Sequence, residues 1–352
     1  MSFAAILPSR DEPTTIAAAT AAADEALADE GAVIVNADSS DDPDTSRRFT
    51  AASTQAVRVP LHGLARGKGA QILAAARRPD LAAAEAVLIA DTDTRNPDPA
   101  VYAALLGRVR AGAALAIADY PRHWDEANLT SHLARPLIAA TTGHDVPQPI
   151  AGDLALSSQA LAAVLQAASA LPAEMTACVD GYGIDAFLLL TAARTGPVTS
   201  VRVGESKVHA GSFPHLPAIY HQAVPVLLHL TATWVPPPLP ETREAAVYRA
   251  ADRTVEPARL QAMIATLDSL GPHPGRYDEH PWPAPAAQAW HAVRAGTPAR
   301  DATRQLWPHY LRRVRDWLTS GQHASTRQRA QALAAAHASL HAAVLAPAGG
   351  RR

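Results

Sequence analysis

The first 120 residues alternate short apolar runs with amphipathic or alanine-rich stretches, and the apolar runs tend to end in polar residues. The continuous apolar runs predict strands over residues 3–7, 31–38, 84–91 and 113–120, with a shorter strand in AVRVPL. Helices are expected between them. This alternation predicts an α/β fold with an open, mostly parallel central sheet. Ligands of such sheets lie outside the carboxyl ends of the strands, so the polar loops after the strands are expected to carry the function.

The pattern changes beyond about residue 216, where the chain reads as helical around the proline-rich breaker VPPPLPE. Leu306, Tyr310, Val314 and Leu318 recur there at helical spacing. We therefore expect two regions. Residues 1–215 would form the catalytic α/β domain, and residues 216–352 a mainly helical C-terminal region that ends in a disordered tail.

The bulk composition argues against several classes of protein. The formal net charge is -2, which gives no electrostatic reason to expect nucleic acid or an anionic membrane as a partner. No uncharged apolar stretch reaches the roughly 18–20 residues of a membrane span, and the N-terminus lacks the basic start of a signal peptide. The single Cys178 cannot form an internal disulfide. We expect a cytoplasmic globular protein.

Two aspartates, Asp91 and Asp93, follow the strand predicted over residues 84–91 in the stretch VLIADTDTRNPDP. Such a pair can hold a divalent cation such as Mg²⁺ or Mn²⁺, act in a phosphatase, or cap a turn. A haloacid-dehalogenase-type phosphatase needs Thr or Val two residues after the second Asp, and this chain has Arg95 there. The phosphatase interpretation is therefore disfavoured, and metal binding and turn capping stay open.

Four further stretches contain residue types suited to a diphosphate, a sugar or a metal. RGKG (residues 66–69) is a glycine loop that opens a predicted helix, where backbone N–H groups and the helix dipole favour an anion. QPIAGD and DGYGID are glycine turns that each present an acid, although helix capping explains a single case equally well. His209 follows a predicted strand in ESKVHAGS. Together these groups are what one metal, a diphosphate and a reacting sugar would require.

Taken in order, these motifs resemble the retaining glycosyltransferases of the GT-A fold that make mannosylglycerate and glucosyl-3-phosphoglycerate. LPSRDEP and NADSSDD resemble that family's nucleotide-binding loops, RGKG its Gly-Lys-Gly segment, and DTDTRNPDP its metal motif. QPIAGD, GYGID and KVHAG resemble its later motifs, which end in a metal-ligand histidine. The likeness runs to about residue 215 and is vague in the C-terminal third.

The resemblance implies roles for individual residues. The metal would be held by Asp93 and His209, with Asp91 at the metal or the ribose, and Asp185 would be the catalytic residue beside the sugar and the acceptor hydroxyl. The residues implied to contact the donor are Pro8, Arg10, Glu12, Asp38, Lys68, Asp91, Thr92, Gly152 and Asp153. The residues implied to contact the acceptor are Arg122, Asn128, Thr130, Tyr182 and Asp185.

The acceptor region departs from both family patterns. The phosphoglycerate type has an arginine two residues before Thr130 and an asparagine two residues after the metal histidine, where this chain has Asn128 and Gly211. The mannosylglycerate type has an aromatic residue three after that histidine, where this chain has Ser212. Loss of a cation that would pair with phosphate argues against a phosphorylated acceptor, although another arginine can substitute.

We therefore expect a metal-dependent retaining hexosyltransferase that uses a nucleotide-sugar, a UDP-sugar more than a GDP-sugar, and a small acidic acceptor such as glycerate. A phosphorylated acceptor is the alternative within this class. The rival classes are an inactive nucleotide-sugar-binding protein and a nucleotidyltransferase, whose glycine-rich N-terminal loop is poorly matched by LPSRDEP. A homodimer built through the C-terminal helices is expected from the family.

Overall fold

The computed structural model describes residues 3–28, 31–209, 211, 213–238, 247–248, 250–251, 253–271 and 281–346. The chain forms two compact units: Met1–Tyr120 with Ile150–Gly211, and Pro121–Pro149 with Ser212–Arg352. The expected boundary at residue 215 lies close to the second junction. Residues 121–149 also belong to the second unit, which was not predicted. They do so because this segment packs against the C-terminal helices.

The first unit is built on a seven-stranded sheet in the order β3-β2-β1-β4-β7-β5-β8. All neighbouring strands are parallel except that β7 runs antiparallel to both β4 and β5. The mostly parallel α/β sheet is therefore confirmed. The strands are β1 (Phe3–Ser9), β2 (Val33–Asp38), β3 (Val57–Leu61), β4 (Ala86–Ile89), β5 (Leu115–Asp119), β7 (Leu154–Ser157) and β8 (Val198–Arg202).

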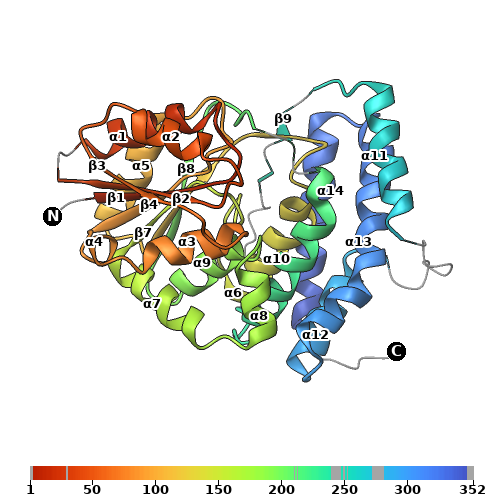
Figure 1. Cartoon of the computed structure of the whole chain (residues 1–352). Coiled ribbons are helices and arrows are strands. Elements are labelled where there is room, and N and C mark those ends of the chain that lie inside the picture. Colours follow the sequence, from red (N-terminus) through yellow and green to blue (C-terminus); the bar gives the residue numbers. More distant parts are fainter. Residues whose placement is uncertain are drawn as a thin grey trace. The chain divides into compact units, whose positions relative to one another are not determined.

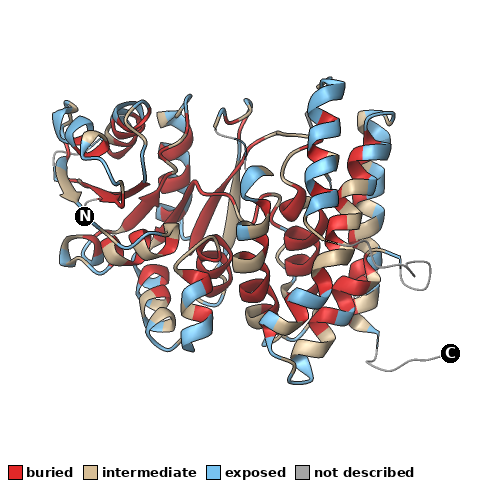
Figure 2. Cartoon of the chain, turned by 45° about the vertical axis from the view of Figure 1, so that its right-hand side comes forward, coloured by how far each residue is buried: buried red, intermediate tan, exposed pale blue. Residues whose placement is uncertain are grey.

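Helices cover both faces of this sheet, which is why its central strands are apolar along their whole length (Figures 1 and 2). In Figure 1, α1 (Ile16–Leu27), α2 (Asp44–Ala51) and α5 (Pro99–Arg110) lie above it. Below it lie α3 (Lys68–Ala76), α4 (Pro79–Ala82), α7 (Ser158–Ser169) and α9 (Ile184–Ala192), and α8 (Ala173–Val179) precedes α9 along the chain. The apolar runs that predicted buried strands are thus buried from two sides.

The antiparallel strand β7 decides which side chains meet at the functional edge. Its first residue, Leu154, pairs with Ile89 near the end of β4 and with Ile117 in β5. Asp153, just before β7, therefore lies at the carboxyl ends of β4 and β5, and its Oδ1 accepts a hydrogen bond from the backbone N–H of Asp91 at 2.9 Å. Strand β7 was not predicted, because LALS is only four residues long and runs directly into the helix that follows.

The second unit is mainly helical, as expected for the C-terminal region. It contains β6 (Arg122–His123), η1 (Thr130–Ala134), α6 (Arg135–Thr142), η2 (Phe213–His215), α10 (Leu216–Thr231), β9 (Ala250–Ala251), α11 (Pro257–Ser269), α12 (Ala284–Arg294), α13 (Ala299–Gly321) and α14 (Thr326–Leu345). The predicted apolar stripe of residues 306–318 lies on α13, and its four members are buried. The tail predicted to be disordered falls mainly on residues 347–352, outside the described residues.

Among the described residues, no single helix has the length and apolar character needed to cross a membrane. Helices α8 and α9 meet that test only as a pair, by length and composition, and the pair is bent by 103°.

Candidate active site

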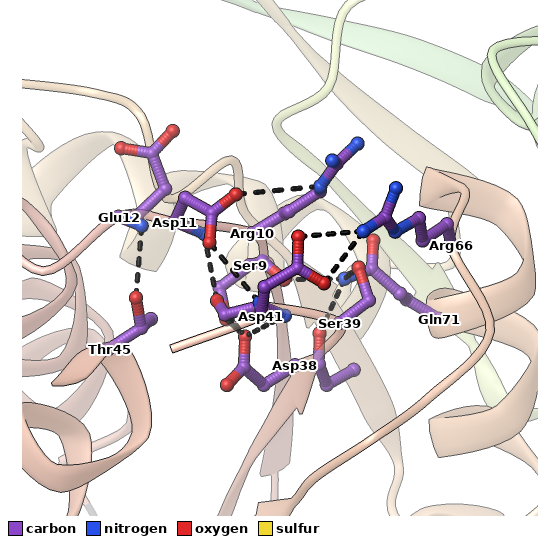
Figure 3. Close-up of polar contacts among 12 residues, drawn as sticks. Ser9, Arg10, Asp11, Glu12, Asp38, Ser39, Asp41, Thr45, Arg66 and Gln71 are labelled. Atoms are coloured by element: carbon purple, nitrogen blue, oxygen red, sulfur yellow. Dashed lines mark hydrogen bonds and ion pairs between the residues drawn. The ribbon is translucent and has the colours of Figure 1, made fainter. Parts of the chain in front are cut away.

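The loops after β1 and β2 are fixed to each other by buried polar side chains (Figure 3). Asn36 donates from Nδ2 to the Leu7 carbonyl at 3.1 Å and to Ser9 Oγ at 2.7 Å, and Ser9 Oγ donates to Asp38 Oδ1 at 3.1 Å. From α3, Gln71 Nε2 donates to the carbonyls of Ser9 and Ala37. These contacts hold two of the predicted donor-binding loops in one conformation.

The predicted donor residues Pro8, Arg10, Glu12 and Thr92 lie at this edge of the sheet. The Pro8 carbonyl accepts from Thr92 Oγ1 at 2.7 Å, so the loop after β1 is tied to the loop after β4. Glu12 is half-buried, and burial raises the pKa of its carboxyl. Arg10 is exposed, with Nε 3.6 Å from Asp11 Oδ2. This edge of the sheet therefore carries an exposed basic side chain, Arg10, next to polar groups that are fixed by hydrogen bonds.

Five charged side chains form an alternating chain at the carboxyl ends of the strands; three are buried, and Lys68 and Asp91 are partly buried. Lys207 Nζ lies 2.9 Å from both Asp153 Oδ2 and Asp91 Oδ2. Lys68 Nζ lies 2.9 Å from both Asp91 Oδ1 and Asp185 Oδ1. The order is thus Asp153, Lys207, Asp91, Lys68 and Asp185. The fold thus brings predicted residues of RGKG, DTDTRNPDP, QPIAGD and GYGID into one cluster.

The facing charges decide the protonation of the middle of this chain. Burial alone would lower the pKa of both ammonium groups, but the carboxylates beside them outweigh it and raise the pKa of Lys68 and of Lys207. Burial alone would raise the pKa of Asp91, but Lys207 and Lys68 outweigh it and hold that pKa far below its usual value. Both oxygens of Asp91 are therefore engaged by ammonium groups, and Asp91 is ionised at any physiological pH.

Lys207 is a member of this cluster that the sequence interpretation missed. A signal was present: the chain has 31 lysines and arginines, but Lys68 and Lys207 are its only lysines. Both lie in this cluster, where a compact ammonium contacts two carboxylates at once. The planar guanidinium of arginine suits parallel, bidentate contacts and does not reproduce that geometry. In a chain that otherwise uses arginine, the two retained lysines mark the cluster.

Two glycines of RGKG are needed for contact with protein backbone. A Cβ on Gly67 would lie 2.3 Å from the Asp180 carbonyl oxygen, and one on Gly69 would lie 1.7 Å from the Val179 carbonyl oxygen. Gly67 also has φ +131°, a conformation that favours glycine. The glycines let the start of α3 close on the turn before α9, and this places Lys68 against Asp185. The expected role of these glycines in approaching phosphate stays a prediction.

Gly152 has a similar role in QPIAGD. A Cβ there would lie 2.1 Å from Asp91 Oδ2. The missing side chain is what allows the Asp91 carboxylate to lie against this loop between its two lysines.

Asp93 and His209 form a second pair of possible ligands in this region. His209 Nδ1 is 3.8 Å from Asp93 Oδ2. The segment that carries His209 runs along the metal motif, since Arg95 N–H donates to the Val208 carbonyl at 2.8 Å and Val208 N–H to Asn96 Oδ1 at 2.8 Å. These hydrogen bonds of the Val208 backbone hold His209 beside Asp93.

This pair fits a divalent cation that is shared with a phosphate ligand. Bonds of about 2.1 Å from one cation allow two ligand atoms to lie up to about 4.2 Å apart, and the observed 3.8 Å falls within that range. Burial and the Asp91 charge raise the pKa of Asp93, and a bound cation would relieve that repulsion. Within the described residues no three such side chains form a complete metal site. Mg²⁺ commonly takes one or two protein ligands and completes its shell with phosphate oxygens and water.

Asp185, the predicted catalytic carboxyl, is the last member of the charge chain, next to Lys68. It lies in the first turn of α9 and is buried. Burial raises the pKa of Asp185 to about 6, although Lys68 opposes the shift. A carboxylate of this kind is ionised at neutral pH and is held close to a cation in a site from which water is largely excluded.

The predicted acceptor residues are divided between the two units. Tyr182 and Asp185 belong to the first unit, whereas Arg122, Asn128 and Thr130 belong to the second. In the second unit, Arg122 lies in β6, and Asn128 and Thr130 are buried around the start of η1. Their contact with an acceptor stays a prediction.

The fold is shared with solved structures of glucosyl-3-phosphoglycerate synthase from Mycobacterium tuberculosis. A complex of that enzyme with phosphoglyceric acid is 22% identical to this chain, with a TM-score of 0.52 over 67% of this chain and 81% of that chain. A complex with Mn²⁺ and UDP-glucose is 22% identical, with a TM-score of 0.52 over 67% and 80% of the two chains. No protein-family model and no curated protein sequence matches. The similarity confirms the expected GT-A type of fold with a helical extension.

Gly69→Ala is expected to destabilise the protein by about 3 kcal/mol or more, because the new methyl group meets backbone that cannot move aside. Gly107→Ala is the matched control. Gly107 lies in α5 with nothing within 4 Å of its Cβ position, so the same exchange is expected to stabilise by about 0.5–1 kcal/mol. Urea unfolding of both variants measures the contrast, and equal effects would show that the close contact at Gly69 is wrong.

Lys207→Arg is expected to destabilise the protein by about 2 kcal/mol or more despite keeping the charge, because the larger group overfills a buried site. Arg202→Lys, at the exposed end of β8, is the control and is expected to change stability by less than about 0.5 kcal/mol. Thermal and urea unfolding test both. A neutral Lys207→Arg would contradict the two-carboxylate contact.

Asp185→Asn tests the raised carboxyl pKa. Because the folded pKa of about 6 exceeds the usual 3.8, folded wild type binds an extra proton between these values and loses relative stability as the pH rises through them. The variant has no such proton. Its stability relative to wild type is therefore expected to rise by about 2 kcal/mol between pH 4 and pH 7, measured by urea unfolding at each pH. A difference that does not change with pH would refute the assignment.

Proposed function

We propose that the protein is a metal-dependent retaining glycosyltransferase that moves a hexose from a nucleotide-sugar to the hydroxyl of a small acidic acceptor. A UDP-sugar is the proposed donor. Glycerate or a related hydroxy acid is the proposed acceptor, and Mg²⁺ or Mn²⁺ the cofactor. The solved structures that share the fold include a complex with Mn²⁺ and UDP-glucose, which supports this choice by analogy.

One observation carries the proposal. Lys68 Nζ contacts both Asp91, in the loop with the metal pair, and Asp185, the proposed catalytic carboxylate. A single ammonium therefore joins the place where a diphosphate would leave to the place where a sugar would react. Transfer of a sugar from a diphosphate needs both features in contact, because negative charge develops on the leaving oxygen while positive charge develops at the sugar C1.

In this scheme the bond between C1 and the diphosphate oxygen breaks, and a bond from C1 to the acceptor oxygen forms on the same face. The acceptor's hydroxyl proton passes to the departing diphosphate. Asp185 stabilises the positive charge at C1 and orients the acceptor, and Lys68 neutralises charge on the leaving group. Retention of configuration is implied by the family resemblance.

Asp93 and His209 would hold the divalent cation, which when bound supplies a Lewis acid to the diphosphate. Asp91 would shape the site through its two lysines. The nearby loops after β1 and β2, with Arg10, Glu12 and Asp38, would hold the nucleotide.

The identity of the acceptor has two candidates. One solved structure that shares the fold holds phosphoglyceric acid, which favours a phosphorylated acceptor. The absence of an arginine at position 128 favours an acceptor with a carboxylate alone. An array of donors against glycerate, 3-phosphoglycerate and other small hydroxy acids, read by mass spectrometry, decides between them. A homodimer stays a prediction from the family.

Asp93→Ala is expected to abolish turnover and to remove metal-dependent donor binding while the fold is kept, because His209 alone cannot hold the cation. Isothermal titration of UDP- and GDP-sugars with and without Mn²⁺ measures binding. Wild-type protein that binds no nucleotide-sugar in the presence of Mn²⁺ would contradict the proposed function. Metal-dependent binding without turnover on any acceptor would point to an inactive binding protein.

The two lysines provide an independent measurement. Selective ¹⁵N-lysine labelling gives two backbone amide signals, one from Lys68 and one from Lys207. Mn²⁺ is expected to broaden the Lys207 signal, because Lys207 lies two residues from His209, and to leave it sharp in Asp93→Ala. Broadening that persists in the variant would place the metal elsewhere.

A further inference from the structure

A second group of polar side chains, in the helical unit, is buried without complete hydrogen bonding. Its centre is His132, in the π-helical turn η1, which is only 2% exposed. Arg313 on α13 donates from Nε to His132 Nδ1 at 3.4 Å. His132 Nε2 and Arg313 Nη2 are both buried and have no hydrogen-bond partner among the described residues. Such orphaned groups call for a water, an ion or a ligand, because buried polar groups are otherwise paired.

The hydrogen bond fixes which of these atoms are donors. Arginine can only donate, so His132 Nδ1 must accept. Burial and the Arg313 charge hold the pKa of His132 well below its usual value, so the ring is neutral and its one proton is on Nε2. Both orphaned atoms, His132 Nε2 and Arg313 Nη2, are therefore N–H donors. They require an acceptor, and beside a guanidinium the favoured acceptor is an anion.

The charge of Asp316, three residues further along α13, raises the pKa of Arg313 and offsets part of the effect of its burial. The nearest acid along α13, Asp316, lies 3.5 Å from Arg312 Nε. Asp125, in the segment before η1, is engaged by Arg253, whose Nε donates to it at 2.9 Å. Burial lowers the pKa of Arg313 and outweighs the opposing effect of the Asp316 charge. The surroundings are aromatic, with the guanidinium 5.6 Å from the centre of the Trp317 ring.

Asn128 adds a group of the opposite kind. It precedes His132 by four residues on the same helical stretch, and residues at that spacing share a face. Its Nδ2 donates to the Asp125 carbonyl at 3.2 Å, while its buried Oδ1 has no partner in the described structure. Two orphaned donors, His132 Nε2 and Arg313 Nη2, and one orphaned acceptor, Asn128 Oδ1, thus belong to the second unit. Together they match a small molecule that has both an anionic group and a hydroxyl.

We propose that Arg313 and His132 form a binding site for the carboxylate or phosphate of a small hydroxy acid, with Asn128 accepting from its hydroxyl. The ligand has two sources that share this chemistry: the acceptor of the proposed reaction, or a separate anion that binds without reacting. Anion binding at this site stands independently of the transferase activity, and only its assignment to the acceptor rests on the proposed function. Arg313 would then replace the cation that the phosphoglycerate type carries at position 128.

The test uses the full-length protein without nucleotide, titrated with sodium phosphate, glycerate and 3-phosphoglycerate at constant ionic strength. Arg313→Gln is expected to weaken binding at least about 10-fold, a typical loss when one partner of a charge-assisted contact is removed. Arg312→Gln is the matched control, because Arg312 is the next residue along α13 and its exposed side chain pairs with Asp316. This variant is expected to bind the anions as wild type does. Arg313→Lys keeps the charge and reports on the site if Arg313→Gln fails to fold.

The outcomes separate the two proposals. Loss of anion binding in Arg313→Gln, with a raised acceptor KM and an unchanged donor KM, would support the site and assign it to the acceptor. The same loss with an unchanged acceptor KM would support a site for a separate anion. Loss of binding in a protein that shows no transferase activity would support the site and overturn the proposed function. Equal binding of all three anions by wild type and by both Arg313 variants, or by none of the proteins, would overturn the site.

Discussion

The contact of Asp91 with two ammonium groups is the interaction on which the candidate active site depends. Asp91 lies between Lys68 and Lys207, and each lysine reaches a further carboxylate beyond it. Removing either lysine would leave a buried carboxylate, Asp153 or Asp185, without the ammonium that it contacts, a cost of about 3–5 kcal/mol. The antiparallel strand β7 makes this arrangement possible, because it brings Asp153 to the edge of the sheet where the parallel strands end.

This network gives the two aspartates of the metal motif different tasks. The sequence interpretation offered Asp91 as a contact of either the metal or the ribose. Because both of its oxygens already accept from lysines, Asp91 is suited to organising the site, and Asp93 with His209 is suited to holding the cation.

The fold was largely predictable from the sequence, because apolar runs long enough to be strands alternate with helical stretches through the first 120 residues. The candidate site was predictable only in part. Lys68, Asp91, Asp93, Asp185 and His209 stood in motifs whose order resembles a known family. Strand β7 is too short to be recognised from its residue pattern. Lys207 could not be predicted from the resemblance, which gives a role in KVHAG only to the histidine two residues later. The need for glycine at positions 67 and 69 could not be predicted from motif spacing. It arises because backbone more than 100 residues later in the sequence packs closely against both positions.

Charge balance links the metal to the donor. The three carboxylates and two ammonium groups of the buried chain sum to one negative charge, and Asp93 adds a second. A nucleotide-sugar, which also carries negative charge on its diphosphate, would be repelled by such a site. A divalent cation at Asp93 and His209 offsets that repulsion, so metal and donor are expected to bind together. In the proposed reaction the diphosphate gains one further negative charge as it leaves, and Lys68 already contacts Asp185, the carboxylate proposed to lie at the reacting sugar. The same cluster that stabilises the fold would in this way place its positive charge where the proposed reaction needs it.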